Sequence, residues 1–367
     1  MIDACDRCLR RAFLVAHLAP RIAGLLDHRP PRIAGLLALP DDAFVAAVAG
    51  DDRDDARAFL DGFEVDWARE ALESFRVVTL CRHADEYPAP VHELADPPAV
   101  LFGLGSIEAL RALRKDPAVT VVGSRRASAY GTEVAYALGR GLGTAGVPVV
   151  SGLAVGIDGT AHRGCLDGSG VTIAVLACGP DVVYPRRHKR LHELIRAEGI
   201  VLSELPPGTR PFRWSFPARN RIMAALARMT VVVEAAEPSG SLITADFARD
   251  LGRAVAAVPG RVTSSIARGT NGLLKDGAAP VTGTQDVLDE LYGVGVRRAP
   301  PIADDRPEPA EPRQRAVLEA AERFASIDAI ARELNLTASN VRAALGRLEA
   351  EGWLVRRDLG GWERTAT

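Results

Sequence analysis

The chain has 367 residues, of which 47% are apolar, so it can bury a substantial core and should form two or three domains. No apolar stretch approaches the roughly 20 residues that a bilayer span needs, and the first residues, MIDACDRCLRR, contain no apolar signal segment. We therefore expect a cytoplasmic protein without a membrane partner. The net charge of -2 excludes a uniformly basic surface, but residues 118–292 alone carry +4, and a phosphate-binding face needs only local positive charge.

The five cysteines are an odd number scattered along a long chain, which argues against a secreted disulfide framework. Cys5 and Cys8 form a C-x-x-C pair, but no second pair of metal ligands follows nearby in the sequence, as a zinc site would require. We therefore predict two free thiols on a helix, and neither a metal site nor a cofactor.

Residues 1–70 are predicted to form a small helical domain, because apolar positions recur near every 3.6 residues and prolines interrupt them. The segment 75–80, FRVVTL, is typical of a strand, and a lead-in rich in prolines follows it. Neither segment suggests a chemistry of its own.

From residue 118, apolar β-branched runs alternate with helical stretches up to residue 292. This alternation predicts a parallel α/β sheet of the Rossmann-like kind, within an extended domain over 71–292. In such sheets, ligands bind beyond the carboxyl ends of the strands.

Turns that combine glycine with serine, threonine or arginine are predicted at that edge of the sheet. Gly123, Ser124 and Arg125 leave a strand and open a helix, so backbone N–H groups, a hydroxyl and a guanidinium can converge on one phosphate. Five such segments predict a phosphate-lined surface longer than one nucleotide needs, although each alone is compatible with a tight connection. They are 121–131, 149–162, 216–222, 239–245 and 267–278.

Basic and aromatic residues are interleaved around Arg213 and Phe216, which suits single strands because rings can stack on unpaired bases. Packing in the core stays an alternative for Phe216 and is favoured for Trp214. A hydrolytic trio of Ser151, Asp158 and His162 can be imagined. We prefer Asp158 as a helix cap and a packed His162, so no catalytic residue is predicted.

The segment 293–312 is rich in proline and charge and is predicted to be a linker. Residues 313–367 then show three amphipathic helices and a two-stranded wing turned at Gly360 and Gly361, the pattern of a winged helix. Its third helix begins near the plausible caps Thr337 and Ser339. That helix offers Ser339, Asn340, Arg342 and Arg347 to DNA or to a protein, and both alternatives stay open.

The motifs GSR with Ser128, SGLAVGID with His162, YP, SE, FPARNRI, SGSLITA and PG, in this order, resemble the DNA-processing protein A (DprA, or Smf) family over about residues 75–290. Two positions depart from the family pattern. Val155 stands where Arg or Lys is frequent, and Arg268 stands where Ser is common, which could remove one phosphate contact and add another.

The resemblance implies a single-stranded DNA-binding protein of natural transformation. Such a protein protects incoming strands, helps to displace single-strand-binding protein, loads the RecA recombinase and forms a homodimer, without catalysis. The residue pattern and the resemblance together predict the DNA-binding residues Gly123, Ser124, Arg125, Ser128, Ser151, Gly152, Gly156, Asp158, Arg213, Phe216, Arg219, Asn220, Arg221, Ser239, Gly240, Ser241, Thr244, Arg268 and Lys275.

Two other functions are compatible with the same elements. A nucleotide-cleaving phosphoribohydrolase shares this type of sheet, but its P-G-G-x-G-T-x-x-E run is absent from the chain. A winged-helix regulator with a nucleotide-sensing central domain would instead bind specific duplex DNA.

Overall fold

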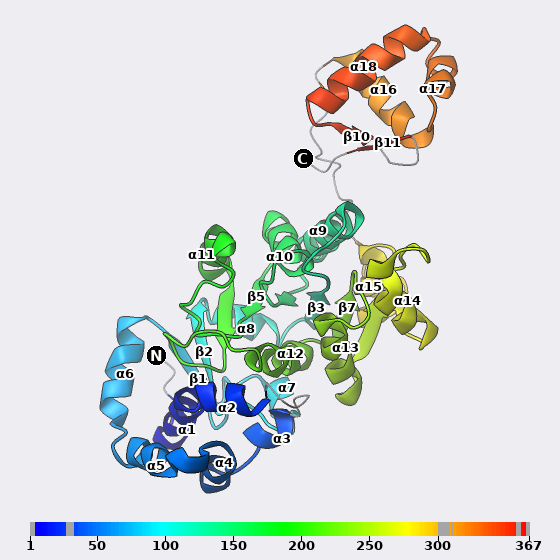
Figure 1. Cartoon of the computed structure of the whole chain (residues 1–367). Helices are drawn as coiled ribbons and strands as arrows, with labels where there is room; N and C mark the ends of the chain where they lie inside the picture. Colours follow the sequence, from blue (N-terminus) through cyan, green and yellow to red (C-terminus); the bar gives the residue numbers. More distant parts are fainter. Residues whose placement is uncertain (1–3, 27–32, 300–308, 310, 357–360, 365–367) are drawn as a thin grey trace. The chain divides into compact units, whose positions relative to one another are not determined.

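The computed structural model describes residues 4–26, 33–299, 309, 311–356 and 361–364. The chain divides into two compact units, Met1–Pro300 and Pro301–Thr367 (Figure 1). Among the described residues, no helix is both long and apolar enough to cross a bilayer.

The first unit is built on one sheet, which contains nine strands within the described residues in the order β1-β2-β6-β5-β4-β3-β7-β8-β9. The strands from β3 to β9 pair in parallel, whereas β2 pairs antiparallel with β1 and with β6. The strands are β1 Val78–Cys81, β2 Val100–Gly105, β3 Val119–Val122, β4 Val149–Ser151, β5 Thr172–Val175, β6 Ile200–Ser203, β7 Met229–Val232, β8 Ala254–Ala257 and β9 Ala279–Pro280.

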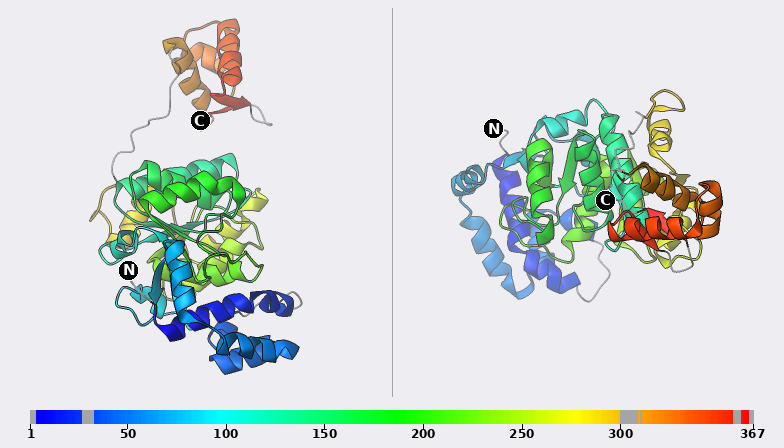
Figure 2. Two further views of the ribbon diagram at one scale, coloured as in Figure 1. Left: turned by 90° about the vertical axis from the view of Figure 1, so that its left-hand side faces the viewer. Right: turned by 90° about the horizontal axis from the view of Figure 1, so that it is seen from above.

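Successive side chains of the buried strands point to opposite faces of the sheet, so both faces are apolar. Helices cover both of them. Val119 and Val121 enter one core, and Val122 enters the other. Helices α9, α10, α11 and α15 cover the first face, and α7, α8, α12, α13 and α14 cover the second (Figure 2). Their bounds are α7 Ala89–His92, α8 Glu108–Ala112, α9 Ala129–Thr144, α10 Ile157–Asp167, α11 Lys189–Glu198, α12 Ser215–Leu226, α13 Gly240–Asp250, α14 Arg268–Lys275 and α15 Thr284–Tyr292.

The strand order changes direction between β3 and β7. After β3, the chain builds β4, β5 and β6 on one side and then returns to place β7 on the other side of β3. The connections that leave β3 and β7 therefore diverge at the carboxyl edge, which opens a crevice at this point in parallel sheets.

The predicted Rossmann-like sheet is confirmed, with the six predicted strands of the alternating region appearing as β3 to β8. Two of the five predicted turns were wrong. Residues 216–222 lie inside α12, and residues 268–275 form α14. The strand β2, which pairs with β1 and β6, was not predicted.

The N-terminal helices pack on the sheet and belong to the same unit. The Trp214 indole is buried and donates a hydrogen bond to the carbonyl of Ala19 at 3.0 Å, so the favoured core role of Trp214 is confirmed. The helices are α1 Asp6–His17, α2 Ala19–Leu26, α3 Ile33–Leu37, α4 Asp41–Val48, the 3-10 turn η1 Gly50–Asp52, α5 Arg53–Asp61 and α6 Val65–Ser74.

No second pair of potential metal ligands follows Cys5 and Cys8 nearby in the sequence, but the fold supplies one. Cys81, at the end of β1, and His83 lie beside them, with all four ligand atoms within 4.8 Å of one another. Cys81 and His83 are more than seventy residues from Cys8 along the chain, so the spacing of residues in the sequence does not indicate that they are neighbours.

The second unit has the predicted winged-helix pattern: α16 Pro312–Arg323, α17 Ile327–Glu333, α18 Ala338–Ala350, β10 Leu354–Arg356 and β11 Trp362–Arg364. Thr337 caps α18 by accepting a hydrogen bond from the Asn340 N–H, at 3.2 Å. Arg342 and Arg347 are exposed on this helix. The predicted turn residue Gly360 lies outside the described residues, as do residues 300–308 and 310 of the predicted linker.

Candidate nucleic-acid interface

A cavity of about 650 Å³ opens at the carboxyl ends of β3 and β7. It is lined by the turn after β3, the start of α12, the start of α13 and the 3-10 turn η3, Ser265–Ala267. The predicted site residues on its wall are Gly123, Ser124, Arg125, Asp158, Phe216, Arg219, Asn220, Ser239, Gly240, Ser241 and Thr244.

A second cavity, of about 230 Å³, lies between the turn after β4 and the segment that follows β5. The two cavities share Arg125, Ala154, Phe216 and Arg219 in their walls. We refer to the two together as the strand-end groove. It extends across the carboxyl ends of several parallel strands, as predicted for the ligand side of the sheet.

The turn after β3 is fixed by Glu234, which follows β7. The Glu234 carboxylate accepts hydrogen bonds from the Ser128 N–H at 2.9 Å and the Ser128 hydroxyl at 2.5 Å, and its carbonyl accepts one from the Ser124 N–H at 2.7 Å. Ser128 also caps α9. The Ser128 hydroxyl is therefore occupied by hydrogen bonds within the protein. Glu234 was not predicted as a site residue, because its only signal in the sequence was an acidic residue directly after an apolar strand.

The turn after β4 is held by its own side chains. Ser151 is buried and donates to the carbonyl of Val121 at 2.6 Å. Asp158 accepts hydrogen bonds from the N–H groups of Gly152 at 3.2 Å and Ala154 at 3.4 Å. Burial raises the pKa of Asp158, against the opposing effect of Arg219. These two predicted DNA contacts thus shape the turn.

Arg219 places a guanidinium at the floor of the strand-end groove. It lies against Gly152, where an added Cβ would be 1.8 Å from its Nη1 atom, so a larger residue at this position would displace the guanidinium. Nη1 donates to the carbonyl of Val175 at 2.6 Å. Burial lowers the Arg219 pKa and Asp158 opposes this effect. The arginine remains a cation at neutral pH, since guanidinium pKa values start above 12.

Gly156 joins the first two turns. Its φ of 80° is in the left-handed region that favours glycine. An added Cβ would lie 2.3 Å from the carbonyl oxygen of Ser124. The predicted glycine is needed for contact between the two turns, and its effect on a ligand is indirect.

The rim of the groove combines a cation with aromatic rings. The Arg125 guanidinium lies over the Phe216 ring, 5.0 Å from its centroid. The Tyr184 ring lies 5.7 Å from Phe216 and is 42% exposed. Tyr184 was missed as a site residue, although the tyrosine-proline pair in a turn after β5 was visible in the sequence. These rings offer flat surfaces beside a positive charge.

The N-terminus of α13 faces the larger cavity through Ser239, Gly240 and Ser241. Nothing lies within 4 Å of a Cβ added at Gly240, so the space in front of it is open. Asn220 supports this turn by donating to the carbonyl of Gly240 at 3.1 Å. The helix terminus adds partial positive charge to the groove, which favours a bound anion.

Several predicted residues lie elsewhere. Arg221 is 1% exposed and pairs with Asp96 and Glu204, so it cannot reach DNA in this structure. Lys275 is the last residue of α14, at the opposite end from the groove. Arg268, the first residue of that helix, and Arg213, before α12, are exposed and belong to neither cavity wall.

The imagined hydrolytic trio is not assembled. The hydroxyl of Ser151 is committed to Val121, and His162 contacts Thr172, with 2.6 Å between Nδ1 and Oγ1. Because the Thr172 hydroxyl donates to the carbonyl of Val149 at 3.1 Å, it accepts from the His162 Nδ1–H. The preferred interpretation of His162 as a packed residue agrees with this geometry.

A prediction follows for acid stability, because burial lowers the pKa of His162 to about 3. Between about pH 6.5 and 3, the unfolded chain binds a proton that the folded chain does not. Stability from neutral His162 is thus present at high pH and lost as pH falls, by up to about 1.4 kcal/mol per pH unit. Urea denaturation gives the free energy of unfolding of the wild type and of His162→Gln at each pH. The wild-type value minus the variant value should decrease by up to that amount for each unit that the pH falls. A difference that does not change with pH would contradict the prediction. Taking the difference also cancels the opposite contribution of Asp96, whose pKa burial raises to about 6.

The fold and the groove define a class: a Rossmann-like domain with a groove at the carboxyl edge of its parallel sheet, followed in the chain by a winged helix. Family models agree with both parts. The model for DNA recombination-mediator protein A matches residues 78–292, and the model for the DprA winged helix domain matches residues 300–358.

Known proteins show the same relationship. The chain is 44% identical, over 72% of its length and 68% of the relative's, to a putative DNA processing protein DprA of Mycobacterium tuberculosis. The crystal structure of DprA from Streptococcus pneumoniae matches with a TM-score of 0.62 and 33% identity, over 78% of this chain and 96% of that one. The structure of DNA processing protein A from Helicobacter pylori, described for its single-stranded DNA binding mode, matches with a TM-score of 0.52 and 32% identity, over 59% and 95%. The chain belongs to the DNA recombination-mediator protein A family and is a DNA-processing protein.

Proposed function

We propose that the strand-end groove binds single-stranded DNA through its phosphates. The observation that carries the proposal is the position of Arg125 and Arg219, which lie in the shared wall of the two cavities. Two guanidiniums and the N-terminus of α13 together supply positive charge along a path longer than one phosphate. The positive net charge of residues 118–292 supports the same ligand.

A single strand fits this groove better than a duplex does. Phe216 and Tyr184 present rings beside Arg125, and unpaired bases can stack on such rings, whereas the bases of a duplex are already stacked. Arg187 lines the smaller cavity together with Val155. The family frequently has Arg or Lys at the position of Val155, and in this chain Arg187 supplies a cation to the same cavity.

The proposed contacts to the strand come from the groove wall and its margin. They are Gly123, Ser124, Arg125, Phe216, Arg219, Asn220, Ser239, Gly240, Ser241 and Thr244, with Tyr184 and Arg187 added and with Arg213 and Arg268 as outer contacts. Five of the predicted residues shape the turns and are not proposed as contacts: Ser128, Ser151, Gly152, Gly156 and Asp158. Arg221 and Lys275 are no longer proposed to bind DNA.

The biological role that we propose is that of a recombination mediator in natural transformation. The protein would protect incoming single strands in the cytoplasm, help to displace single-strand-binding protein and load RecA recombinase, as a homodimer and without catalysis. Membership in a family described as recombination mediators supports this role. The groove supports the DNA-binding step of the proposal alone.

Fluorescence anisotropy with labelled poly-dT and a matched duplex, across a salt series, tests the DNA step. We expect preference for the single strand and affinity that falls steeply with salt, because bound phosphates release counterions. Equal binding of both, or duplex preference, would contradict the groove model and favour a winged-helix regulator. RecA filament formation on poly-dT covered by single-strand-binding protein tests the mediator step, and no acceleration by the protein would contradict that step alone.

Substitution of Phe216 separates stacking from charge. We expect Phe216→Leu to weaken poly-dT binding by roughly 1–3 kcal/mol, because a stacked ring contributes about that much per base. The salt slope should not change, since no charge is removed. Anisotropy at several salt concentrations measures both quantities. Unchanged affinity would place the bases elsewhere.

A further inference from the structure

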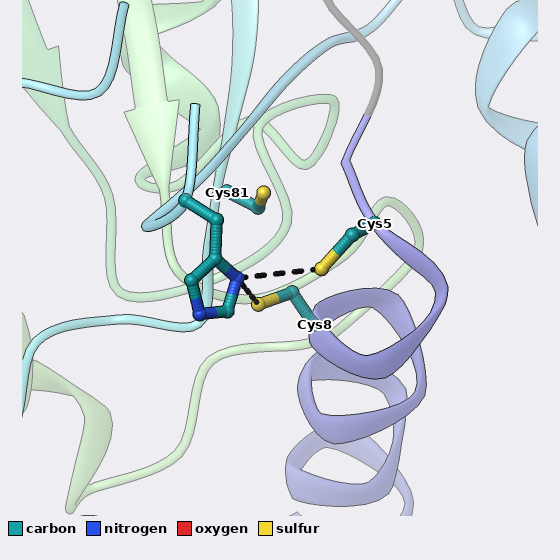
Figure 3. A group of neighbouring side chains, drawn as sticks. Cys5, Cys8 and Cys81 are labelled. Atoms are coloured by element: carbon teal, nitrogen blue, oxygen red, sulfur yellow. Dashed lines mark hydrogen bonds between the residues drawn. The ribbon is translucent and has the colours of Figure 1, made fainter. Parts of the chain in front are cut away.

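The N-terminal helices meet the sheet at a cluster of sulfur and nitrogen ligands that the proposed function does not use. Cys5 is the N-cap residue of α1, Cys8 lies in the first turn of that helix, Cys81 ends β1 and His83 follows it. Figure 3 shows the side chains of Cys5, Cys8 and Cys81 gathered around a common space between the helix and the strand.

The distances fit a small tetrahedral cation. The Nδ1 atom of His83 lies 3.4 Å from the Sγ atoms of both Cys5 and Cys8, and all four ligand atoms lie within 4.8 Å of one another. Zinc bonds of about 2.3 Å to sulfur and 2.0–2.1 Å to nitrogen place neighbouring ligand atoms about 3.5–3.8 Å apart at tetrahedral angles. Only small side-chain adjustments separate the cluster from this geometry.

The chemistry of the ligands selects the metal. Three thiols and one imidazole form a Cys₃His set, which is typical of structural zinc, and soft sulfur ligands disfavour Mg²⁺ and Ca²⁺. Four protein ligands leave no open position for a substrate.

We propose that Cys5, Cys8, Cys81 and His83 bind one structural Zn²⁺ ion that fastens α1 to the end of the edge strand β1. Cys8 and Cys81 are 1% and 3% exposed, so the ion would be shielded from water on one side, while His83 closes the site at the surface. Leu9 and Ala12 of the same helix pack with Val100 and Phe102 of β2, so the ion would reinforce an existing apolar contact.

Metal analysis of the full chain tests this proposal. Protein kept reduced, incubated with zinc and dialysed should contain about one zinc ion per chain by mass spectrometry of the element, as a closed four-ligand site requires. Substitution of Co²⁺ should give absorption from sulfur-to-cobalt charge transfer. Zinc at background level, or a mass deficit of two hydrogens showing a Cys5–Cys8 disulfide in protein purified with reductant, would overturn the proposal.

Variants assign the ligands. His83→Ala removes an exposed side chain, so the fold should survive, and we expect zinc affinity to fall at least about tenfold in competition with a chelator. Cys5→Ser should lower it similarly. Cys178→Ser is the matched control, because this cysteine is buried away from the cluster and bonds to the carbonyl of Val182. Equal zinc affinity in all three variants would overturn the assignment.

A second readout follows the fold itself. Removal of zinc by a chelator should speed amide hydrogen exchange at the start of α1 and in β1 by roughly tenfold or more, because metal binding stabilises only the folded contact. Exchange in α13 serves as the internal reference, because this helix packs in a different apolar core from Cys8 and Cys81 and lies against β7, away from β1 in the strand order. Identical exchange at α1 with and without zinc would show that no such fastening exists.

Discussion

Arg125→Ala is expected to weaken binding of poly-dT tenfold or more. The guanidinium lies in the wall shared by both cavities and over the Phe216 ring, where it can contact a phosphate and support a stacked base. A hydrogen bond to a charged group contributes about 1.5–3 kcal/mol, which sets the lower bound. The slope of log affinity against log salt should also decrease by about 0.7, the contribution of one phosphate in a single strand.

Arg249→Ala is the matched control for this change. It removes the same charge from an exposed position in the last turn of α13, at the far end of that helix from the groove. Its affinity and salt slope should remain within error of wild type. Equal losses in both variants would mean that the overall charge, and not the groove, attracts the strand.

Arg221→Met should destabilise the first unit by about 3–5 kcal/mol, because removing one partner of a buried ion pair leaves the other charges buried and unpaired. The Arg221 guanidinium lies 2.5 Å from Glu204 and 3.3 Å from Asp96, and the arginine and aspartate side chains are 1% and 2% exposed. Urea denaturation, monitored by amide hydrogen exchange in β3 to β8, measures the free energy of unfolding of this unit separately from that of the winged helix.

A charge-neutralised variant provides the control for Arg221. Arg221→Met combined with Asp96→Asn and Glu204→Gln removes the stranded carboxylates, so part of the lost stability should return. In either variant, protein that remains folded should keep the wild-type salt slope for poly-dT. A changed slope with unchanged stability would show that Arg221 contacts DNA after all.

The contrast between Arg125, Arg219 and Arg221 shows how far sequence reasoning reached. All three follow glycine or aromatic motifs and were predicted to bind phosphate. In the structure, Arg125 lies on the rim of the groove and Arg219 lies on its floor. Arg221 is buried in an ion pair with Glu204. Nearly every residue of α12 is buried, so the helix has no polar stripe that would have separated these roles.

The sequence by itself determined the parallel sheet, the turns after β3, β4 and β7 and the winged helix, because these depend on local periodicity and on glycine and capping residues close in the chain. Tertiary structure alone decided which arginine faces the groove and which turn residues are consumed by Glu234 and Asp158. It also brought Cys81 and His83 to Cys5 and Cys8. These outcomes depend on contacts between residues far apart in the sequence, which local patterns do not encode.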